Sequence, residues 1–238
     1  MIPANWFIPN GVKLVFTTRA GGVSGAPYDS LNLGDHVGDS PEAVAENRKR
    51  LQQIYGLDTC LPWLEQVHGT CVVNLDNDNN RTADGSFTTS QHQVCVVMTA
   101  DCLPVLLCDR GGKQLAAVHA GWRGLCDGVI ESALTQFTGD SRDIIAYLGP
   151  AIGQQSFEVG PEVRAAFTAV DAASQQYFRS FGDKYLADLQ GLAARRLNLS
   201  GVEQVYTLGH CTYQNASDYF SYRRETTTGR MASLIWRE

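Results

Sequence analysis

Several common sequence signals are missing from this 238-residue chain. No apolar run approaches the roughly 18 residues that span a bilayer, and the N-terminus lacks a basic region followed by an apolar stretch, so we expect neither a membrane segment nor a signal peptide. The patterns G-x-x-x-x-G-K-[ST] and G-x-G-x-x-G do not occur, which argues against a nucleotide P-loop and a dinucleotide-binding fingerprint. With a net charge of −6 and no long basic stripe, the chain is not expected to bind nucleic acid.

The cysteines do not follow a disulfide pattern. There are seven of them, an odd number, and no C-x-x-C occurs, while several lie inside apolar runs. These features predict reduced thiols in a cytoplasmic protein, most of them buried as small hydrophobic residues. A hydrophobic content of 44% and a charged content of 18% are typical of an ordinary soluble globular protein.

Strand and helix patterns are mixed along the chain without strict βαβ alternation. Apolar runs predict strands near residues 12–18, 62–67, 71–75, 94–98, 103–108, 114–118, 144–148, 205–208 and 233–236. Periodicity and start signals predict helices over 41–55, 125–137, from 161 onward and over 185–197. We therefore expect an α/β (α+β) fold, a single domain over residues 1–238 in which a mixed β-sheet is flanked by helices.

Three short motifs supply one sulfur and two imidazole groups that suit a divalent metal. His68 lies in LEQVHG, Cys102 in MTADCLPVLL and His119 in AAVHAGWRG. Three protein ligands leave a fourth position open on zinc, which is the arrangement of catalytic rather than structural zinc sites. The alternative is that Cys102 is an inert buried thiol and His119 is a core histidine bonded to a backbone carbonyl.

Hairpin geometry brings two of these residues together. Two apolar runs flank Asp109-Arg-Gly-Gly112, which carries the turn residues that a hairpin needs. If Cys108 pairs with Lys113, the same antiparallel register places Cys102 opposite His119. Opposite residues of an antiparallel pair have Cα atoms roughly 4.5–5.5 Å apart, so this register predicts a shared site.

The segment after His119 is a candidate anion site. The string HAGWRG predicts a strand, a glycine turn and a helix start, where backbone N–H groups and the Arg123 guanidinium would hold a phosphate. The alternative is a glycine-rich turn with Arg123 in a surface ion pair. Asp101 precedes Cys102, and neighbours on a strand point to opposite faces, but a bend over residues 99–101 would let Asp101 orient a ligand imidazole or act as a base.

Longer strings of the chain resemble the YfiH family, also called the polyphenol-oxidase or multicopper-laccase-like domain family. In chain order they are TTRAGGVSGAPYDSLNLGDHVGD, ENRKRL, WLEQVHG, MTADCLPVLL, AAVHAGWRGL, LGPAIG, FEVGPEV, GDKYLADL, CTY and FSYRRETTTGRMASLIW. The resemblance covers nearly the whole chain and implies a single α/β domain with a mixed sheet, similar to bacterial cysteine-hydrolase-like toxins. It also implies a zinc ion bound by His68, Cys102 and His119.

The resemblance further implies an enzyme of purine nucleoside metabolism. The family is associated with phosphorolysis of adenosine, inosine and methylthioadenosine, with adenosine deamination, with phenol oxidation by copper, and with peptidoglycan editing by hydrolysis of a wrongly built muramyl-peptide precursor. Multicopper oxidation ranks last, because the further copper cluster of a laccase needs more histidines than the five present. A single copper ion would still suit two histidines and a cysteine.

Zinc-assisted chemistry on a purine nucleoside ranks first. Zinc lowers the pKa of bound water, so hydroxide attack at C6 of adenine, with Asp101 shuttling protons, would give deamination. In phosphorolysis the nucleophile is phosphate, which Arg123 and the helix start behind it would hold. Two alternatives stay open, namely hydrolysis of a muramyl-peptide amide at the same centre and a different mechanism with Cys102 as nucleophile and His119 as its base.

Substrate contacts are expected from four further residues. Asn32 and Gln66 would meet a purine or sugar edge, and Tyr222 or Phe157 would stack on the base. The expected partners are therefore a purine nucleoside and phosphate, with the oligomeric state left open.

A non-enzymatic alternative is a structural zinc site in a binding module. His210 or Cys211 would then close the fourth position on the metal. Loss of one ligand would unfold such a module, whereas an enzyme would lose activity and keep its fold.

Overall fold

A computed structural model describes residues 2–238. In chain order its elements are β1 (Val12–Phe16), α1 (Pro41–Tyr55), β2 (Val72–Asn74), β3 (Gly85–Thr88), β4 (Val94–Thr99), β5 (Leu103–Asp109), β6 (Leu115–Ala120), α2 (Trp122–Asp127), α3 (Val129–Leu134), the 3₁₀ helix η1 (Ser141–Asp143), β7 (Ile144–Leu148), β8 (Glu158–Val159), α4 (Pro161–Val170), the 3₁₀ helix η2 (Ala172–Tyr177), β9 (Phe178–Phe181), β10 (Lys184–Ala187), α5 (Leu189–Leu199), β11 (Gln204–Thr207) and β12 (Met231–Arg237). The expected mixture of strands and helices is confirmed.

The strands form three sheets. The largest has the order β11-β7-β5-β6-β3-β2, in which β11 pairs with β7 and β2 pairs with β3 in parallel, while the other neighbours are antiparallel. A second sheet, β1-β12-β4, and a small third sheet, β8-β10-β9, are antiparallel throughout. The predicted mixed sheet is confirmed, because parallel and antiparallel pairs share the largest sheet.

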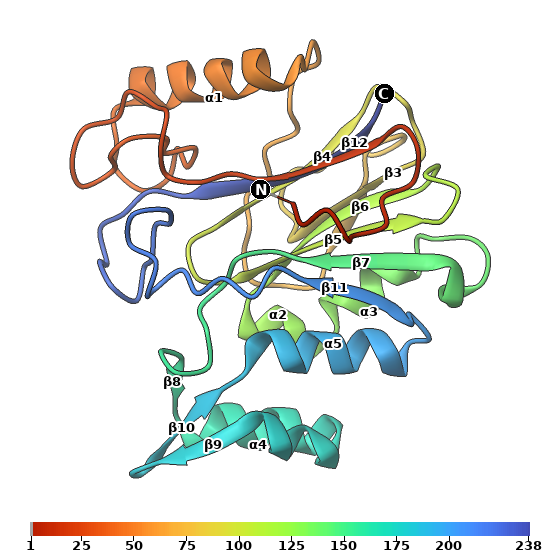
Figure 1. Cartoon of the computed structure of the whole chain (residues 1–238), viewed down its shortest axis with the longest axis vertical. Helices are drawn as coiled ribbons and strands as arrows, with labels where there is room; N and C mark the ends of the chain where they lie inside the picture. The colour runs from red at the N-terminus through yellow and green to blue at the C-terminus, as the bar shows by residue number, and fades with distance from the viewer. Residues whose placement is uncertain (1) are drawn as a thin grey trace.

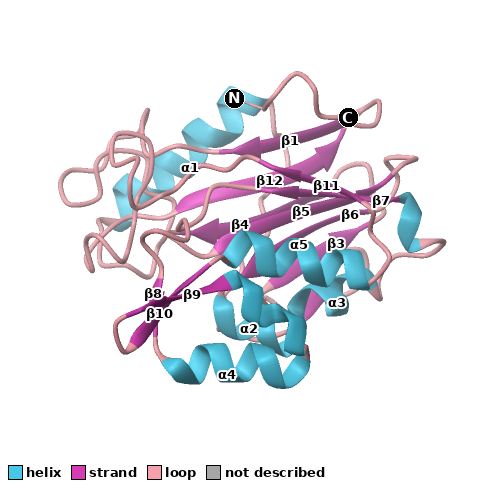
Figure 2. Ribbon diagram, turned by 60° about the horizontal axis from the view of Figure 1, so that its bottom comes forward, coloured by secondary structure: helices cyan, strands magenta, loops and turns pink. Residues whose placement is uncertain are grey.

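Side-chain alternation on the central strands separates two apolar cores. On β5, Val105 and Leu107 belong to the core shared with the helices, whereas Leu106 and Cys108 belong to the core shared with the three-stranded sheet. Successive strand residues point to opposite faces, so a strand buried on both sides is a continuous apolar run. Figures 1 and 2 show the resulting layers: α1, the three-stranded sheet, the six-stranded sheet, then α2, α3 and α5, and finally α4 beside the small sheet.

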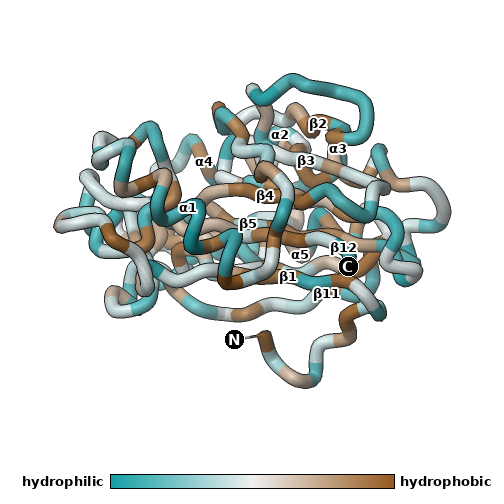
Figure 3. Tube along the Cα trace, turned by 90° about the horizontal axis from the view of Figure 1, so that it is seen from above, coloured by the Kyte–Doolittle hydropathy of each residue, from teal (hydrophilic) through white to brown (hydrophobic). Residues whose placement is uncertain are grey.

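Helix α1 covers the outer face of the three-stranded sheet. Ser40 is its N-cap, as the pattern predicts, and accepts a hydrogen bond from the Ala43 N–H (3.3 Å). The helix is mostly hydrophilic in Figure 3, with few hydrophobic positions, and Val44 and Leu51 are buried. Ile54, on the same helix, borders an open depression beside β1 and is 63% exposed.

One predicted helix is divided at a glycine, and one predicted strand does not form a ladder with a neighbour. The helix expected over 125–137 begins earlier and is divided into α2 and α3 at Gly128, whose φ of 102° is left-handed. The strand expected over 62–67 is reduced to an isolated bridge between Glu65 and Thr82.

No helix within residues 2–238 is long and apolar enough to cross a membrane.

The helix expected over 185–197 begins four residues late. Asp188 caps α5 by accepting a hydrogen bond from the Gly191 N–H (2.9 Å), which fixes the start of the helix at Leu189. The preceding residues pair with β8 and β9 as strand β10. The amphipathic pattern therefore ran across the end of a strand into a helix.

Loops from distant parts of the chain gather at one edge of the sheets. The loop before α1, the β4–β5 turn, the loop after β7 and the long segment between β11 and β12 all lie on the left in Figure 1. Loops at the ends of buried strands are where rigid scaffolds commonly present polar side chains for binding and catalysis.

Candidate metal centre and adjoining cavity

His68, Cys102 and His119 lie together at the loop-rich edge. Their ligand atoms all lie within 4.8 Å of one another, and within residues 2–238 no other group of three or more His, Cys, Asp or Glu side chains has a metal-binding arrangement. The Cys102 Sγ and the His68 Nε2 are 3.8 Å apart, and the two imidazole centroids are 4.8 Å apart. The structure therefore brings together the three residues that the motifs single out.

The hairpin of β5 and β6 has a different register from the one predicted. Cys108 pairs with Leu115 and not with Lys113. The prediction was wrong by two residues because Lys113 belongs to the turn, where its N–H donates to the carboxylate at the turn's start (2.6 Å). A two-residue shift keeps each side chain on its face of the sheet, so Cys102 and His119 become diagonal neighbours and still meet.

Asp84 holds the His119 imidazole and the backbone of His68 in place. Its fully buried carboxylate accepts hydrogen bonds from the backbone N–H groups of Val67 (3.2 Å), His68 (2.9 Å) and Gly69 (2.6 Å). These bonds hold His68 at a φ of 60°, a left-handed conformation that non-glycine residues rarely adopt. The same carboxylate accepts from the His119 Nδ1 (2.8 Å), which leaves His119 Nε2 for a ligand role.

The electrostatics of this group favour an ionised thiolate. Burial opposes ionisation of Cys102, but the His119 and His68 imidazoles outweigh it and lower the pKa of the thiol to about 6. Burial also disfavours charge on His119, yet the Cys102 thiolate and Asp84 raise the pKa of its imidazole. Burial alone would raise the pKa of Asp84. The hydrogen bond with His119 is the largest of the contacts that outweigh burial, and the pKa of the carboxyl is lowered.

The spacing of the group fits a tetrahedral metal ion. With Zn–S of about 2.3 Å and Zn–N of about 2.0–2.1 Å, tetrahedral angles hold a sulfur and a nitrogen ligand about 3.6 Å apart. The observed Sγ–Nε2 distance of 3.8 Å is close to this value. Gly121 makes room for the group, because a Cβ at that position would lie 2.8 Å from His68 Cδ2 and 3.1 Å from Cys102 Sγ.

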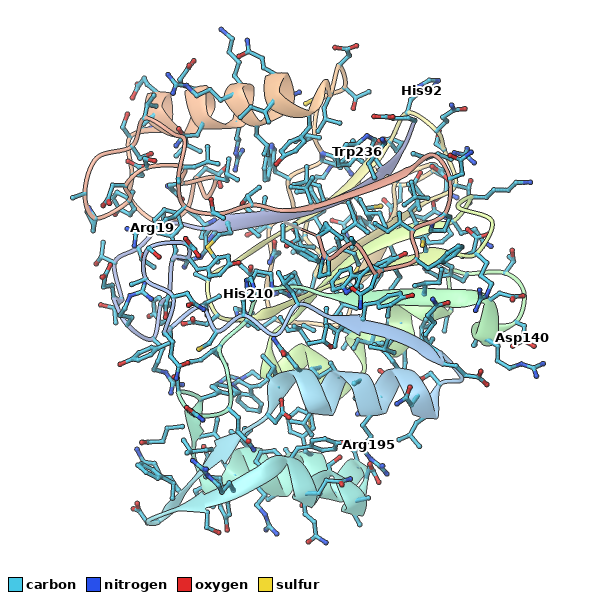
Figure 4. All side chains as sticks on the ribbon, in the orientation of Figure 1. Arg19, His92, Asp140, Arg195, His210 and Trp236 are labelled. Carbon is cyan, nitrogen blue, oxygen red and sulfur yellow. The ribbon has the colours of Figure 1, made fainter. Side chains whose placement is uncertain are left out.

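The fourth ligands of the structural-zinc alternative lie outside the group. His210 Nδ1 is 2.8 Å from the Tyr219 hydroxyl, and Cys211 Sγ accepts the Gly153 N–H (3.2 Å). Figure 4 shows His210 in the segment that follows β11, near the middle of the molecule, and His92 at the upper right. Since no fourth His, Cys, Asp or Glu of residues 2–238 joins the three, a metal held there would keep one position open.

A cavity of about 410 Å³ adjoins the three residues. Its lining consists of His36, Gln66, His68, Met98, Thr99, Ala100, Cys102, His119, Tyr222 and Arg230. Of the predicted substrate contacts, Tyr222 and Gln66 lie on this lining. Tyr222 is 53% exposed, but the Gln66 amide bonds at both ends to the Met98 backbone (2.8 and 2.7 Å), so Gln66 holds the end of β4.

The other predicted contacts lie away from the lining. Asn32 is fully buried and accepts the Arg230 N–H (2.9 Å). Phe157 is part of the helix-side core. Arg123 is exposed, with its guanidinium 4.6 Å from the Trp122 ring centroid. The substrate roles of Asn32 and Phe157 and the phosphate role of Arg123 stay predictions, without support from the cavity lining.

Asp101 occupies the expected bend, but its carboxylate bonds to the segment before β12 and to neither imidazole. It has a φ of 91°, and its buried carboxylate accepts from Thr212 Oγ1 (2.6 Å), Ser221 Oγ (3.0 Å) and the Arg223 N–H (2.7 Å). These bonds tie the segment before β12 to the β4–β5 turn. The carboxylate that orients an imidazole is Asp84 instead, and the role of Asp101 as a base stays a prediction.

Three residues of the site, Asp84, His36 and Arg230, were not predicted from the sequence. Asp84 directly precedes a strand after a polar loop, where an aspartate is usually interpreted as a turn residue. His36 and Arg230 lie within the strings that resemble the family, NLGDHVGD and TTTGRM, and only family membership of those strings hinted at a function. Their place on the cavity depends on loops that meet only in the fold.

Known proteins are similar to this chain over nearly its full length. Residues 13–238 match a family model described as multi-copper polyphenol oxidoreductase laccase. Purine nucleoside phosphorylase YfiH of Escherichia coli (strain K12) is 53% identical over 238 residues, covering 99% of this chain and 98% of that protein. A purine nucleoside phosphorylase of Haemophilus influenzae is 48% identical over 241 residues, covering 100% of this chain and 99% of that protein.

The fold agrees with a solved structure as well. The crystal structure of Neisseria meningitidis protein NMB0706 superposes with a TM-score of 0.93 at 47% identity, covering 99% of this chain and 98% of that chain. Identity at this level over full-length chains confirms the resemblance that the motifs indicated. The chain therefore belongs to the YfiH family.

Proposed function

We propose that this chain is a purine nucleoside phosphorylase that works in the cavity beside His68, Cys102 and His119. The observation that carries the proposal is a three-ligand group opening into a cavity of about 410 Å³, in a chain 53% identical to a purine nucleoside phosphorylase. An open position is typical of catalytic metal sites, and such a cavity suits a small molecule. Adenosine, inosine and methylthioadenosine are the proposed substrates, and residues 1–238 are proposed to act as one catalytic domain.

Zinc is the proposed metal, held by His68 Nε2, Cys102 Sγ and His119 Nε2. One thiolate and two imidazoles form a set that zinc accepts tetrahedrally, and the Asp84 bond to His119 is the kind of outer contact that orients such ligands. When bound, the ion would supply a Lewis-acid centre beside the substrate. Copper also accepts this ligand set, so metal analysis of the purified protein distinguishes the two ions.

Phosphorolysis joins phosphate to the sugar and releases the base. A phosphate oxygen forms a bond to C1′ of the ribose as the bond from C1′ to the purine nitrogen breaks. The bonding electrons leave with the base, which takes up the proton that hydrogen phosphate loses, so the products are free purine and ribose 1-phosphate. The reaction therefore requires a surface for the base and a cationic site for phosphate.

The residues of the chain that we assign to the nucleoside are few. Tyr222, half-exposed on the lining, is proposed to stack on the purine face. Asp101 is proposed as a positioning residue, because its bond to the Arg223 N–H holds the segment that carries Tyr222. Gln66 is proposed to position the end of β4 through Met98.

Adenosine deamination is a second proposed reaction of the same cavity, and it ranks below phosphorolysis. Deamination replaces the amino group at C6 with an oxygen from water, and a carboxylate normally moves the protons. Within residues 2–238 the cavity lining contains no Asp or Glu. Asp84 is already engaged by His119 and three backbone N–H groups. Phosphorolysis needs no such carboxylate and is therefore favoured.

The test is product analysis with the zinc-loaded protein. Adenosine, inosine or methylthioadenosine is incubated with and without phosphate, and products are separated by chromatography. We expect free base and the sugar 1-phosphate only when phosphate is present, and no product from a Cys102→Ala control that keeps its fold. Inosine formed from adenosine reports deamination. If no nucleoside reacts, or wild type and control are equal, the proposal fails and muramyl-peptide precursors become the substrates to test.

A further inference from the structure

Arg230 is the one arginine or lysine on the lining of the cavity within residues 2–238. It directly precedes β12, and its side chain is partly buried. Arginine is rarely buried without a charged partner, since a desolvated charge is costly unless it is paired. Within residues 2–238 no carboxylate lies within ion-pairing distance of Arg230, in contrast with Arg195, Arg196 and several other arginines.

The Arg230 guanidinium keeps most of its donors for a ligand. Its Nη1 donates to the backbone carbonyls of Thr228 and Gly229 (3.1 Å each). Its Nε and Nη2 donate to no atom of residues 2–238. Burial lowers the pKa of Arg230, and the negative charges at Cys102 and Asp101 only partly offset that effect. A guanidinium with free parallel donors matches the geometry of a phosphate.

His36 lies on the rim of the same cavity and adds a second donor. Its imidazole is 56% exposed, and its Nδ1 is 3.5 Å from an Asp35 oxygen. Burial and the positive charge of Arg230 lower the pKa of His36, so the two groups interact electrostatically. An anion between His36 and Arg230 would favour the protonated imidazole, which can donate to the anion from Nε2 while its Nδ1 faces Asp35.

One buried amide fixes the relative position of these two groups. The Asn32 Oδ1 accepts the Arg230 N–H (2.9 Å) and the Gly34 N–H (3.0 Å), and its Nδ2 donates to the Gly34 carbonyl (3.0 Å). A Cβ at Gly34 would lie 2.8 Å from Arg230 Cγ, so the arginine side chain rests directly on the loop that leads to His36. The loop and the start of β12 therefore form one preorganised unit.

We propose that Arg230, with His36 at the rim, forms the subsite that binds the attacking phosphate. This inference rests on the proposed phosphorylase function. In the step defined above, the subsite holds the phosphate through the oxygens that do not attack C1′, while the attacking oxygen faces the ribose. The subsite expected from sequence at Arg123 is less suited, because Arg123 is exposed and off the cavity lining.

The test separates phosphate binding from turnover in the zinc-loaded protein. Calorimetric titration with inorganic phosphate gives its Kd, and steady-state kinetics gives separate KM values for phosphate and nucleoside. For Arg230→Gln we expect the phosphate Kd and KM to rise about 10- to 100-fold, the range for loss of a charge-assisted bidentate contact, with the nucleoside KM little changed. Arg230→Lys should recover part of the loss, because it restores the charge without the fork.

Two further variants guard against misfolding and general charge effects. Gly34→Ala presses on Arg230 without removing its charge and should raise the phosphate KM. Arg179→Gln removes an exposed arginine of β9 and should leave both KM values unchanged. Melting temperatures near that of the wild type show that the variants are folded.

The outcomes distinguish failure of the subsite from failure of the proposed function. If nucleosides are not phosphorolysed but wild type binds phosphate and Arg230→Gln does not, the subsite stands and the function fails. If phosphorolysis occurs and Arg230→Gln leaves the phosphate Kd and KM unchanged, the function stands and the subsite is overturned. A rise confined to Arg123→Gln, or a wild type that neither binds nor uses phosphate, also overturns the subsite.

Discussion

Cys102 and Cys108 lie at opposite ends of β5, and their thiols differ sharply. Cys108 is buried between the sheets, where burial raises the pKa of its thiol to about 12. Cys102, just before the strand, is partly buried, and two imidazoles lower the pKa of its thiol to about 6. Charged neighbours, and not burial alone, therefore decide whether a cysteine is inert or reactive.

The same contrast separates two regions of the molecule. The core between the sheets is apolar and includes Cys95, Leu106 and Tyr147. The loop-rich edge is organised by buried carboxylates, each satisfied by several donors, with Asp84 behind the imidazoles and Asp101 beneath the segment before β12. The first region supplies stability and the second places the polar groups, so mutations should affect stability and metal affinity separately.

The largest expected effect is on stability, from Leu106→Ala in the core between the sheets. Removal of this fully buried side chain should lower the free energy of unfolding by about 2–5 kcal/mol, because it leaves a cavity. Zinc affinity should stay unchanged, since Leu106 lies four positions, about 13 Å, along the chain from Cys102. Denaturant unfolding and zinc titration measure the two effects, with Leu106→Met as the volume-conserving control. A large loss of zinc affinity in the Ala variant would remove the division between the regions.

Asp84→Asn should give the next largest effect, now on the metal. The variant loses the charge that fixes the His119 ring and the His68 backbone, so zinc affinity should fall about 10- to 100-fold. Competition with a chelator of known affinity measures the change. Asp76→Asn, which alters a carboxylate bonded to Thr88 and Thr89, is the matched control and should leave zinc affinity unchanged. Equal losses in both variants would show that Asp84 has no special link to the centre.

The last test introduces no substitution and compares the reactivity of the thiols directly. In metal-free protein the lowered pKa keeps Cys102 as thiolate above about pH 6, so its alkylation by iodoacetamide should be near its plateau at pH 7 and fall below pH 6. Cys95 and Cys108, with pKa values raised to about 12, should react only after unfolding. Peptide mapping by mass spectrometry assigns each site, and zinc should protect Cys102. Alkylation of Cys108 at a comparable rate would contradict the comparison.

The candidate site could be predicted from sequence only as far as its ligand types and one hairpin. The motifs singled out His68, Cys102 and His119, and the pairing of β5 with β6 was correct even though its register was wrong by two residues. The error was harmless because a two-residue shift preserves the face on which each side chain lies. The Asp109 carboxylate accepts the Lys113 N–H and so keeps Lys113 in the turn. The apolar pattern of the strands gave no sign of this bond.

The remaining site residues depend on contacts between distant loops. Arg230 meets the cavity because Asn32, 198 residues away, accepts its backbone N–H. Asp84 contacts His119 only because β3 pairs with β6, and the strand prediction had not included β3. Most helix and strand positions followed from periodicity. The helix predicted over 185–197 was placed four residues too early at its start, because one amphipathic pattern covered the end of β10 and the start of α5.

The most direct test of the central claim is a crystal structure of the zinc-loaded protein with anomalous diffraction measured at the zinc edge. We expect a single strong peak about 2.3 Å from Cys102 Sγ and about 2.0–2.1 Å from the Nε2 atoms of His68 and His119, with no fourth protein ligand. A peak closed by a fourth side chain, or zinc bound elsewhere with this group empty, would contradict the claim that the loop-rich edge holds an open metal centre.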